Sequence, residues 1–329
     1  MTKIDIFSGF LGAGKTTLIR KLISEAFKGE KLVLIENEFG EIGVDGAFMQ
    51  DAGIEVTEMN SGCICCSLVG DFGKALHQVL ETYHPDRILI EPSGVGKLSD
   101  VIRAVQNLHM EDVTLNSFTT VADANKCKMY MKNFGEFYND QIEHANSIIL
   151  SRTDGIKPEK LEACVALLRE HNQNATIITT PWDQLTGAQI LETMEHKNTL
   201  EEELKLLAEE TEHEHHHHHD HDHDEHDEHD HEHHHHHHAD EVFTSWGTET
   251  TRKFTKDEIE HILEELDNSE KYGMILRAKG IVAGRDGEWI HFDYVPEETS
   301  VRNGSAGVIG RLCVIGSHIN EAAIEALFA

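Results

Sequence analysis

The fold of this chain is decided by the stretch Gly9-Phe10-Leu11-Gly12-Ala13-Gly14-Lys15-Thr16-Thr17. It matches the phosphate-binding pattern of a glycine, four residues and then Gly-Lys-Ser/Thr. The apolar run Ile4–Phe7 before it predicts a short buried strand, and Leu18–Ile23 after it predicts an amphipathic helix. The alternative is a glycine-rich turn between a strand and a helix that binds nothing. This alternative is disfavoured because the motif is complete and lies between the two elements that it requires. The stretch therefore predicts a P-loop that binds a nucleoside triphosphate.

The residues of this loop have distinct expected roles. Glycines let the backbone wrap a phosphate, and the start of the helix adds N–H groups and the positive end of the helix dipole. We expect Lys15 to bridge the outer phosphates and the Thr16 hydroxyl to help hold Mg²⁺. The residues expected to contact the nucleotide here are Gly9, Gly12, Ala13, Gly14, Lys15, Thr16 and Thr17.

A strand that ends in a carboxylate supplies a second part of the site. The run Arg87–Ile90 precedes Glu91, and Gly94 follows three residues later. In P-loop proteins a carboxylate at this place reaches the Mg²⁺ ion, and such a glycine offers its N–H to the γ-phosphate. A buried strand with a proline-containing turn is the other interpretation. With the P-loop present, we expect Glu91 to act in catalysis with Lys15 and Thr16, and Gly94 to bind nucleotide.

Another strand end bears on the choice of base. The run Ile148–Leu150 is followed by Ser151-Arg152-Thr153-Asp154, where guanine-binding proteins usually carry Asn-Lys-x-Asp. Asp154 can accept hydrogen bonds from N1 and N2 of guanine, which are donors that adenine lacks. Serine is too short to copy an asparagine amide, whereas the stem of Arg152 can pack on a base. The pattern favours guanine, and hence GTP, with Asp154 as a nucleotide ligand.

Length, charge and cysteine usage exclude several classes of protein. The chain has 329 residues, enough for two domains, and a formal net charge of −32, the wrong sign for nucleic acid or an anionic membrane. No apolar run approaches the ~20 residues that span a bilayer, and we expect no signal peptide before the first strand. Cys127, Cys164 and Cys313 are scattered, which predicts small buried side chains rather than a disulfide framework. We expect a cytoplasmic protein.

The alternation of elements predicts the fold class. Up to about Thr180, short apolar strands alternate with helical segments, which is the pattern of an α/β domain with a mostly parallel sheet. We expect helices such as Phe72–Tyr83 and Glu159–His171. The expected strands are Ile4–Phe7, Leu32–Ile35, Ile54–Thr57, Ile88–Ile90, Phe118–Ala122, Ser147–Leu150 and Ala175–Thr179.

The rest of the chain divides where the composition changes. Residues 212–238 are all His, Asp or Glu, which cannot build a core, so we expect a disordered insert. After it, a small α+β domain is expected, with strands Glu241–Trp246, Met274–Val282, Glu288–Tyr294 and Val308–Ile315, helices Lys256–Asp267 and Asn320–Phe328, and a hairpin turn at Asp286-Gly287. The expected order is a P-loop GTPase domain at residues 1–184, a connecting helix at 185–211, the insert at 212–239 and the C-terminal domain at 240–329.

Three clustered thiols follow the strand expected at Ile54–Thr57. Cys63, Cys65 and Cys66 cannot all face a core, and the vicinal pair is poorly placed for an ordinary disulfide. Thiolates suit a borderline metal such as Zn²⁺. Redox sensing or burial of the thiols is the other interpretation. If this strand runs parallel to the first one, both loops leave the same edge of the sheet, and loss of the γ-phosphate can move the thiolates.

The segment Glu36–Gly46 also leaves a strand at that edge. Its carboxylates and glycines suit a mobile switch, and a polar surface loop is the alternative.

The acidic insert is rich in metal-binding side chains. Neutral imidazole is a common metal ligand near pH 7, and neighbouring carboxylates add oxygen donors. A purification tag sits at a terminus and lacks His-Asp repeats, so a solubilising linker is the remaining alternative. A tethered tract raises the metal concentration near the cysteines. We expect reversible capture of Zn²⁺, Ni²⁺ or Co²⁺ by imidazoles that include His215, His217, His219, His221 and His223.

Together these motifs resemble the CobW-type metallochaperone GTPases, relatives of the nickel inserters of hydrogenase and urease (the CobW/HypB/UreG group). The resemblance implies that the chain binds GTP and Mg²⁺ and hydrolyses GTP slowly. It also implies Cys63, Cys65 and Cys66 as ligands of Zn²⁺ or Co²⁺, with Glu36 or Glu41 as helpers from the switch. The matching segments, in the family's order, are Gly9–Thr17, Glu36–Glu41, Asn60–Cys66, Glu91–Gly94, Arg277–Gly280 and Trp289–Val295.

These observations lead to a hypothesis of function. We expect a GTP-hydrolysing metallochaperone that delivers Zn²⁺, Co²⁺ or Ni²⁺ to a client metalloprotein under nucleotide control. A metal storage or sensing protein that uses the histidine tract is one alternative, and a nucleotide-driven enzyme of cobalt-cofactor biosynthesis is another. Neither nucleic acid nor a membrane is an expected partner, and the sequence leaves the oligomeric state open, a homodimer included.

Overall fold

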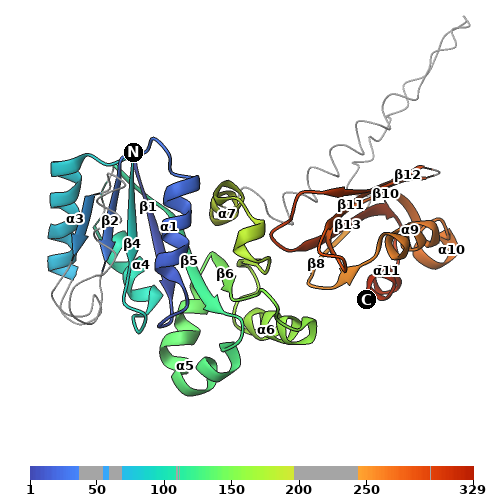
Figure 1. Ribbon diagram of the computed structural model, residues 1–329, viewed down its shortest axis with the longest axis horizontal. Helices are drawn as coiled ribbons and strands as arrows, with labels where there is room; N and C mark the ends of the chain where they lie inside the picture. The colour runs from blue at the N-terminus through green and yellow to red at the C-terminus, as the bar shows by residue number, and fades with distance from the viewer. Residues whose placement is uncertain (37–54, 59–68, 109, 111, 196–243, 297) are drawn as a thin grey trace, which may run out of the picture. The chain divides into compact units, whose positions relative to one another are not determined.

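The chain contains two compact units, Met1–Lys197 and Asn198–Ala329. The computed structural model describes residues 1–36, 55–58, 69–108, 110, 112–195, 244–296 and 298–329. The first unit is a parallel α/β domain, and the second is built on an antiparallel sheet (Figure 1). Residues 196–243 lie outside the described residues, so the expected boundaries at 211 and 239 remain predictions.

The described residues of the first unit form a sheet of seven strands in the order β3-β2-β4-β1-β5-β6-β7. Every neighbouring pair is parallel, as the alternation of strands and helices predicted. Burial explains why β2, β4, β6 and β7 are largely apolar runs. The strands are β1 (Thr2–Gly9), β2 (Leu32–Glu36), β3 (Glu55–Glu58), β4 (Arg87–Glu91), β5 (Val113–Asp123), β6 (Ser147–Ser151) and β7 (Thr176–Ile178).

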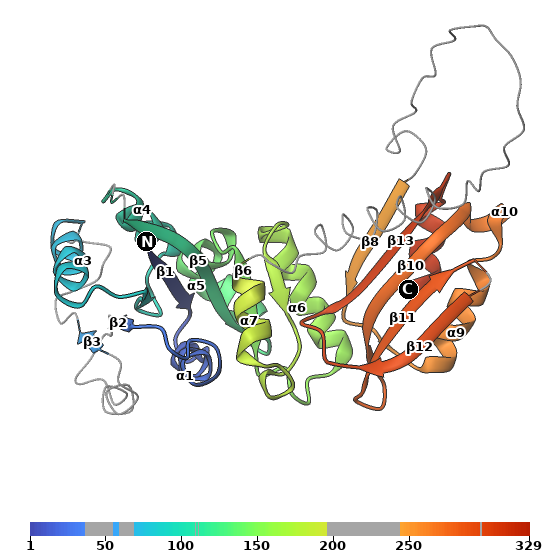
Figure 2. The same ribbon diagram turned by 90° about the horizontal axis from the view of Figure 1, so that it is seen from above.

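Helices cover both faces of this sheet (Figure 2). Because successive side chains of a strand point to opposite faces, Ile4 and Ile6 share one face. They belong to a buried core with Leu76 of α3 and Leu98 of α4, whereas α1 packs against α7. The helices are α1 (Lys15–Glu25), α3 (Val69–Tyr83), α4 (Leu98–Gln106), α5 (Cys127–Glu143), α6 (Pro158–His171) and α7 (Gly187–Met194), with a 3₁₀ turn, η1, at Trp182–Gln184.

The start of the expected connecting helix belongs to the first unit. Thr186 and Gln189 form a reciprocal capping box that begins α7 within the segment 185–211. The N–H of Gly187 donates to the Glu25 carboxylate at 2.7 Å, which ties α7 to the end of α1. Residues 187–194 therefore pack on the P-loop domain rather than leaving it.

The second unit is an antiparallel sheet in the order β12-β11-β10-β13-β8, with β9 beside β10. Gly287 has a φ of 92° between β10 and β11, which confirms the predicted hairpin turn. Ile259 and Leu263 of α9 and Ile324 of α11 pack on one core with the sheet. The elements are β8 (Thr244–Thr250), β9 (Lys253–Phe254), α9 (Lys256–Glu265), α10 (Ser269–Tyr272), β10 (Met274–Gly284), β11 (Trp289–Val295), β12 (Glu298–Gly304), β13 (Gly310–Ser317) and α11 (Glu321–Phe328).

Among the residues that the structure describes, no helix has the length and apolar character needed to cross a membrane.

Candidate functional site

The P-loop connects the carboxyl end of β1 to the start of α1. Gly9, Gly12 and Gly14 have φ angles of 142°, 68° and 107°, a region that side chains disfavour. A Cβ on Gly9 would lie 2.3 Å from the carbonyl oxygen of Val121 on β5. Ala13 is buried and its N–H donates to the carbonyl of Phe10 at 3.1 Å, whereas Thr17 is exposed on α1. The sequence motif therefore forms the tight loop that phosphate binding requires.

Lys15, Thr16 and Glu91, the three residues predicted to act in catalysis, lie close together at this loop. The buried Nζ of Lys15 donates to the carbonyl of Gly9 at 3.1 Å and lies 4.0 Å from Oε1 of Glu91. The Thr16 hydroxyl donates to the Glu91 carboxylate, with Oε1 at 3.1 Å and Oε2 at 3.2 Å. Hydroxyl and carboxylate oxygens are ligands that Mg²⁺ prefers, so this donor set fits that ion.

Gly94 lies against the backbone of the P-loop. A Cβ at this position would be 2.8 Å from the backbone nitrogen of Leu11, so glycine is needed for the close approach. The buried side chain of Gln141 on α5 donates to the carbonyls of Gly94 at 3.1 Å and Gly96 at 2.8 Å. Gln141 thus fixes the turn after β4. Sequence reasoning missed it, because one buried amide in a polar helix carries no distinguishing pattern.

The base loop, Ser151–Asp154, begins at the end of β6. Arg152 has a φ of 55°, and its guanidinium donates to the carbonyl of Gly12 at 2.9 Å and to the carboxylate of Asp123. Ser151 is buried with Oγ 3.5 Å from the carbonyl of Ala122, and Asp154 is exposed. Arg152 therefore joins the base loop to the P-loop, and Asp154 is accessible to a ligand.

Glutamate positions also follow one another along the carboxyl edge of the sheet beyond the P-loop. Glu91 on β4, Glu36 on β2 and Glu58 on β3 occupy one register row across three neighbouring strands. The row leads from the Lys15–Thr16 site to the end of β3, after which the cysteine segment follows in the sequence. Parallel strands thus bring the P-loop and the end of β3 to the same edge, as predicted, whereas residues 59–68 lie outside the described residues.

Most of the predicted metal ligands lie outside the described residues. Among the residues that the structure describes, no group of three or more His, Cys, Asp and Glu side chains is arranged to hold a metal ion. The predicted ligands that lie outside the described residues are Glu41, Cys63, Cys65, Cys66, His215, His217, His219, His221 and His223.

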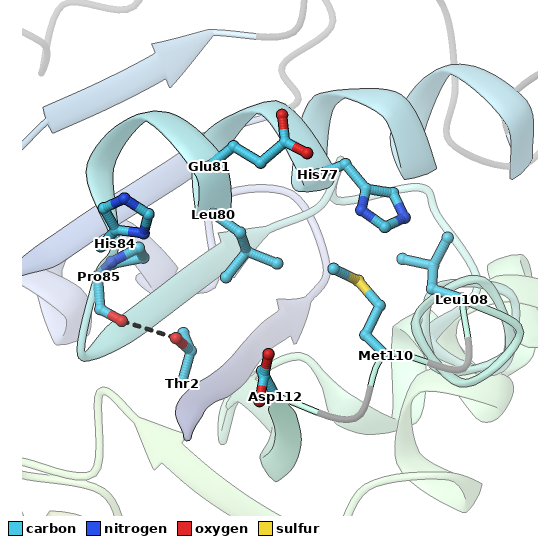
Figure 3. Close-up of a pocket in the computed structure, with 9 residues that line it drawn as sticks. All are labelled: Thr2, His77, Leu80, Glu81, His84, Pro85, Leu108, Met110 and Asp112. Atoms are coloured by element: carbon cyan, nitrogen blue, oxygen red, sulfur yellow. Dashed lines mark hydrogen bonds between the residues drawn. The ribbon is translucent and has the colours of Figure 1, made fainter.

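The opposite edge of the sheet carries a pocket of about 520 Å³ (Figure 3). The hydroxyl of Thr2, at the start of β1, donates to the carbonyl of Pro85 at 2.7 Å within it. The pocket lies at the amino ends of β1, β4 and β5, whereas the P-loop follows the carboxyl end of β1. The two are therefore at opposite ends of the strands. It is lined by Thr2, His77, Leu80, Glu81, His84, Pro85, Leu108, Met110 and Asp112.

Comparison with known proteins finds relatives that match about half of this chain. The zinc chaperone YeiR of Escherichia coli K12 is 29% identical over 188 residues, which are 57% of this chain and 57% of that protein. The zinc chaperone CobW of a Sinorhizobium species is 33% identical over 187 residues, 48% of this chain and 52% of that one. The zinc-regulated GTPase metalloprotein activator 1 of Schizosaccharomyces pombe is 30% identical over 191 residues, 55% and 46% of the two chains. The chain thus spans about half the length of these relatives.

A solved structure of Zn(II)-bound YjiA GTPase from E. coli aligns with 99% of this chain and 98% of its own, with a TM-score of 0.42 and 21% identity. Two family models match the sequence. The model of the cobalamin synthesis protein cobW C-terminal domain matches residues 243–329. The model of the CobW/HypB/UreG nucleotide-binding domain matches residues 3–179, which is more than half of the chain. The chain belongs to the CobW/HypB/UreG family.

Proposed function

We propose that this protein is a GTP-hydrolysing metallochaperone that carries Zn²⁺ to a client metalloprotein. The observation that supports this most is the register row Glu91–Glu36–Glu58, which joins the phosphate site to the strand that precedes the three clustered cysteines. A change at the phosphates can therefore reach the metal-binding segment across two strands. Co²⁺ and Ni²⁺ are the other candidate cargoes.

The nucleotide side of the function uses the residues at the P-loop. Lys15 and the backbone N–H groups of the loop would bind the phosphates, and Gly94 would offer its N–H to the terminal one. Thr16 and Glu91 would hold Mg²⁺, which neutralises charge that develops on the phosphates. Asp154 would accept hydrogen bonds from the guanine base. These contacts position the nucleotide for hydrolysis.

The metal side of the function needs a large change in affinity. We propose Cys63, Cys65 and Cys66 as the ligands, with Glu36 or Glu41 as helpers. A structural zinc site is worth ~10–16 kcal/mol, so unassisted release from one would be slow. Moving a site from mostly occupied to mostly empty takes about 5.5 kcal/mol of differential affinity. Withdrawal of one thiolate after hydrolysis, or a client with better ligands, could supply this difference.

The experiment that tests the proposal measures Zn²⁺ affinity by competition with a chelating dye. The full chain is compared with a GTP analogue, with GDP and without nucleotide, and so is a variant that lacks residues 212–238. We expect the affinity to differ between nucleotide states in both proteins, and Cys65→Ser to abolish the difference. Cys313→Ala, a buried cysteine in the second domain, is the matched control. Equal affinities in the three states would refute nucleotide control.

A second candidate function is metal storage or sensing by the histidine tract, with incidental nucleotide turnover. The composition of residues 212–238 favours it. Deletion of these residues separates the two functions. If a client enzyme is still activated in metal-replete cells, the tract serves storage and the chaperone function stands; if activation is lost even there, the tract is the functional site.

We also propose a cellular location, a partner and an assembly for this activity. Reduced clustered thiols suit the cytoplasm. A client metalloprotein is the proposed partner, and a homodimer is the proposed assembly to be tested by its mass in solution with and without nucleotide.

A further inference from the structure

Trp182 occupies a position at the nucleotide site that none of the sequence motifs includes. It is the first residue of η1, after the last strand of the parallel sheet. Its Nε1–H donates to the carbonyl of Leu150 at 2.9 Å, and Leu150 is the residue immediately before the base loop. The indole is therefore anchored to the end of β6.

The other edge of the indole reaches the P-loop. A Cβ placed on Gly14 would lie 3.3 Å from Cη2 and 3.8 Å from Cζ3 of Trp182. The same point lies 3.9 Å from Cβ of Ser151. The benzene edge of Trp182 and the side chain of Ser151 thus both lie next to Gly14. Gly14 is the residue directly before Lys15 in the sequence.

This contact accounts for the departure of the base loop from the usual guanine motif. An asparagine at Ser151 would add an amide that could link the base loop to the P-loop backbone. Serine lacks this amide, and a large ring lies against the same glycine. Two side chains connect the base loop to the P-loop in its place. The exposed guanidinium of Arg152 makes a polar contact with the carbonyl of Gly12, and the half-buried indole of Trp182 makes an apolar contact with Gly14.

We propose that Trp182 is the positioning residue of the nucleotide site: its indole holds the base loop against Gly14 and so sets the distance between the base contact of Asp154 and the phosphates. The proposal deepens the proposed function, on whose guanine nucleotide it rests. It predicts that Trp182 governs the preference for guanine over adenine, because Asp154 is useful only at the correct distance from bound phosphates.

The test measures the affinities of the full chain for Mg²⁺-GDP and Mg²⁺-ADP by titration calorimetry. We expect Trp182→Ala to weaken GDP binding about tenfold and to leave ADP binding almost unchanged, since an aromatic packing contact contributes on this scale. Trp182→Phe, which keeps a ring but loses the hydrogen bond to Leu150, should be intermediate. Trp246→Ala, in the second domain, is the matched control and should change neither affinity.

A double-mutant comparison distinguishes positioning from general damage to the fold. Ser151→Asn should weaken GDP binding in the wild-type background, because its amide competes with the indole for space. The same substitution should strengthen GDP binding in the Trp182→Ala background, because the amide then replaces the lost link. Losses that add in the double variant, or equal losses for GDP and ADP in Trp182→Ala, would overturn the proposal.

The result also separates this proposal from the proposed function. If the wild-type chain binds ADP as well as GDP, guanine selection in the proposed function fails, and so does the predicted effect of Trp182 on base preference. The signs of Ser151→Asn in the two backgrounds, measured with GDP, then test the remaining part of the proposal, that the indole holds the base loop against Gly14. If those signs are the same, the role of Trp182 is refuted while GTP binding stands.

Discussion

The hydroxyl of Thr16 and the carboxylate of Glu91 are hydrogen-bonded, with Oε1 at 3.1 Å and Oε2 at 3.2 Å from Oγ1. The two residues come from α1 and β4, and they meet because β4 lies next to β1 in the sheet. Their oxygens therefore lie within hydrogen-bonding distance of one another. Rigid elements of the fold, a helix start and a strand end, hold both proposed Mg²⁺ ligands in position.

Neutralising Glu91 should impair Mg²⁺-dependent nucleotide turnover. Glu91→Gln keeps the size of the side chain and the contact with Thr16 but removes the charge. Residues that support a metal ligand in this way typically contribute ~10–100-fold to metal affinity or activity. We expect GTP hydrolysis at limiting Mg²⁺ to fall within that range, measured as phosphate release against Mg²⁺ concentration.

The control for this prediction is Glu162→Gln, which neutralises an exposed glutamate on α6 of the same domain. It should leave the Mg²⁺ dependence unchanged. A Glu91→Gln protein with the Mg²⁺ dependence of the wild type would remove Glu91 from the ion site.

Two glycines of the P-loop should differ in their tolerance of alanine. At Gly9 a Cβ would lie 2.3 Å from a backbone carbonyl of β5, which cannot move without breaking the sheet. At Gly12 a Cβ meets nothing within 4 Å, so only the left-handed φ of 68° is unfavourable. We expect Gly12→Ala to lower the free energy of unfolding by ~1–2 kcal/mol and Gly9→Ala to lower it by more. Urea unfolding curves measure both, and equal losses would contradict the steric argument.

Many strands of the first domain were predictable because each one has a recognisable pattern within a few consecutive residues. All seven expected strands are present. Strands such as β2, β4 and β6 were predictable because a buried parallel strand is a short apolar run bounded by turn residues. The strand β12 was not expected: it lies at the end of its sheet, and Glu298–Gly304 has six of seven residues exposed. An edge strand of this kind carries little apolar pattern to recognise.

The candidate site was predictable only where its chemistry follows a motif. Lys15, Thr16 and Glu91 stand in motifs whose spacing predicts their roles, and the structure brings them together. Gln141 and Trp182 reach the site through the packing of a distant helix and turn. Their positions depend on tertiary structure, so no local pattern in the sequence could reveal them.

The stability of the second domain should depend on pH through Glu258. Its carboxylate accepts a hydrogen bond from the backbone N–H of Thr255 at 2.7 Å, which, with Arg285 and Arg252 nearby, holds its pKa below the usual value. A lowered folded-state pKa means that the stabilisation is present above the pKa of the unfolded chain and is lost as pH falls through the folded value. We expect Glu258→Gln to lower the melting temperature at pH 7, and we expect this effect to decline as the pH falls below the ordinary glutamate pKa of about 4.3.

Nuclear magnetic resonance titration of the Glu258 carboxyl provides the direct measurement. The matched control is Glu260→Gln, an exposed neighbour on the same helix. If the two variants melt alike at pH 7, the negative charge of Glu258 contributes nothing to stability.

Removing the guanidinium of Arg87 should lower the free energy of unfolding of the first domain by more than removal of a surface ion pair does. Arg87 is 2% exposed at the start of β4 and bonds Asp5 at 2.5 Å, Glu30 at 2.6 Å and Glu195 at 3.3 Å. Burial alone lowers its pKa, but the hydrogen bond with Glu30 and the charge of Asp5 raise the pKa above the usual value. Breaking a buried pair of this kind costs ~3–5 kcal/mol because the partner charge is left buried.

We therefore expect Arg87→Ala to lower the free energy of unfolding by about that amount. Arg103→Ala, whose side chain is 67% exposed beside Asp100, should cost under ~1 kcal/mol. Urea unfolding followed by the fluorescence of Trp182, in a Trp246→Phe/Trp289→Phe background, reports on the first domain alone. Adding Asp5→Asn to Arg87→Ala should recover part of the loss, since it removes the stranded charge. If Asp5→Asn deepens the loss instead, the hydrogen bonds that Asn116 and Ser117 donate to Asp5, rather than its charge, determine the stability of this cluster.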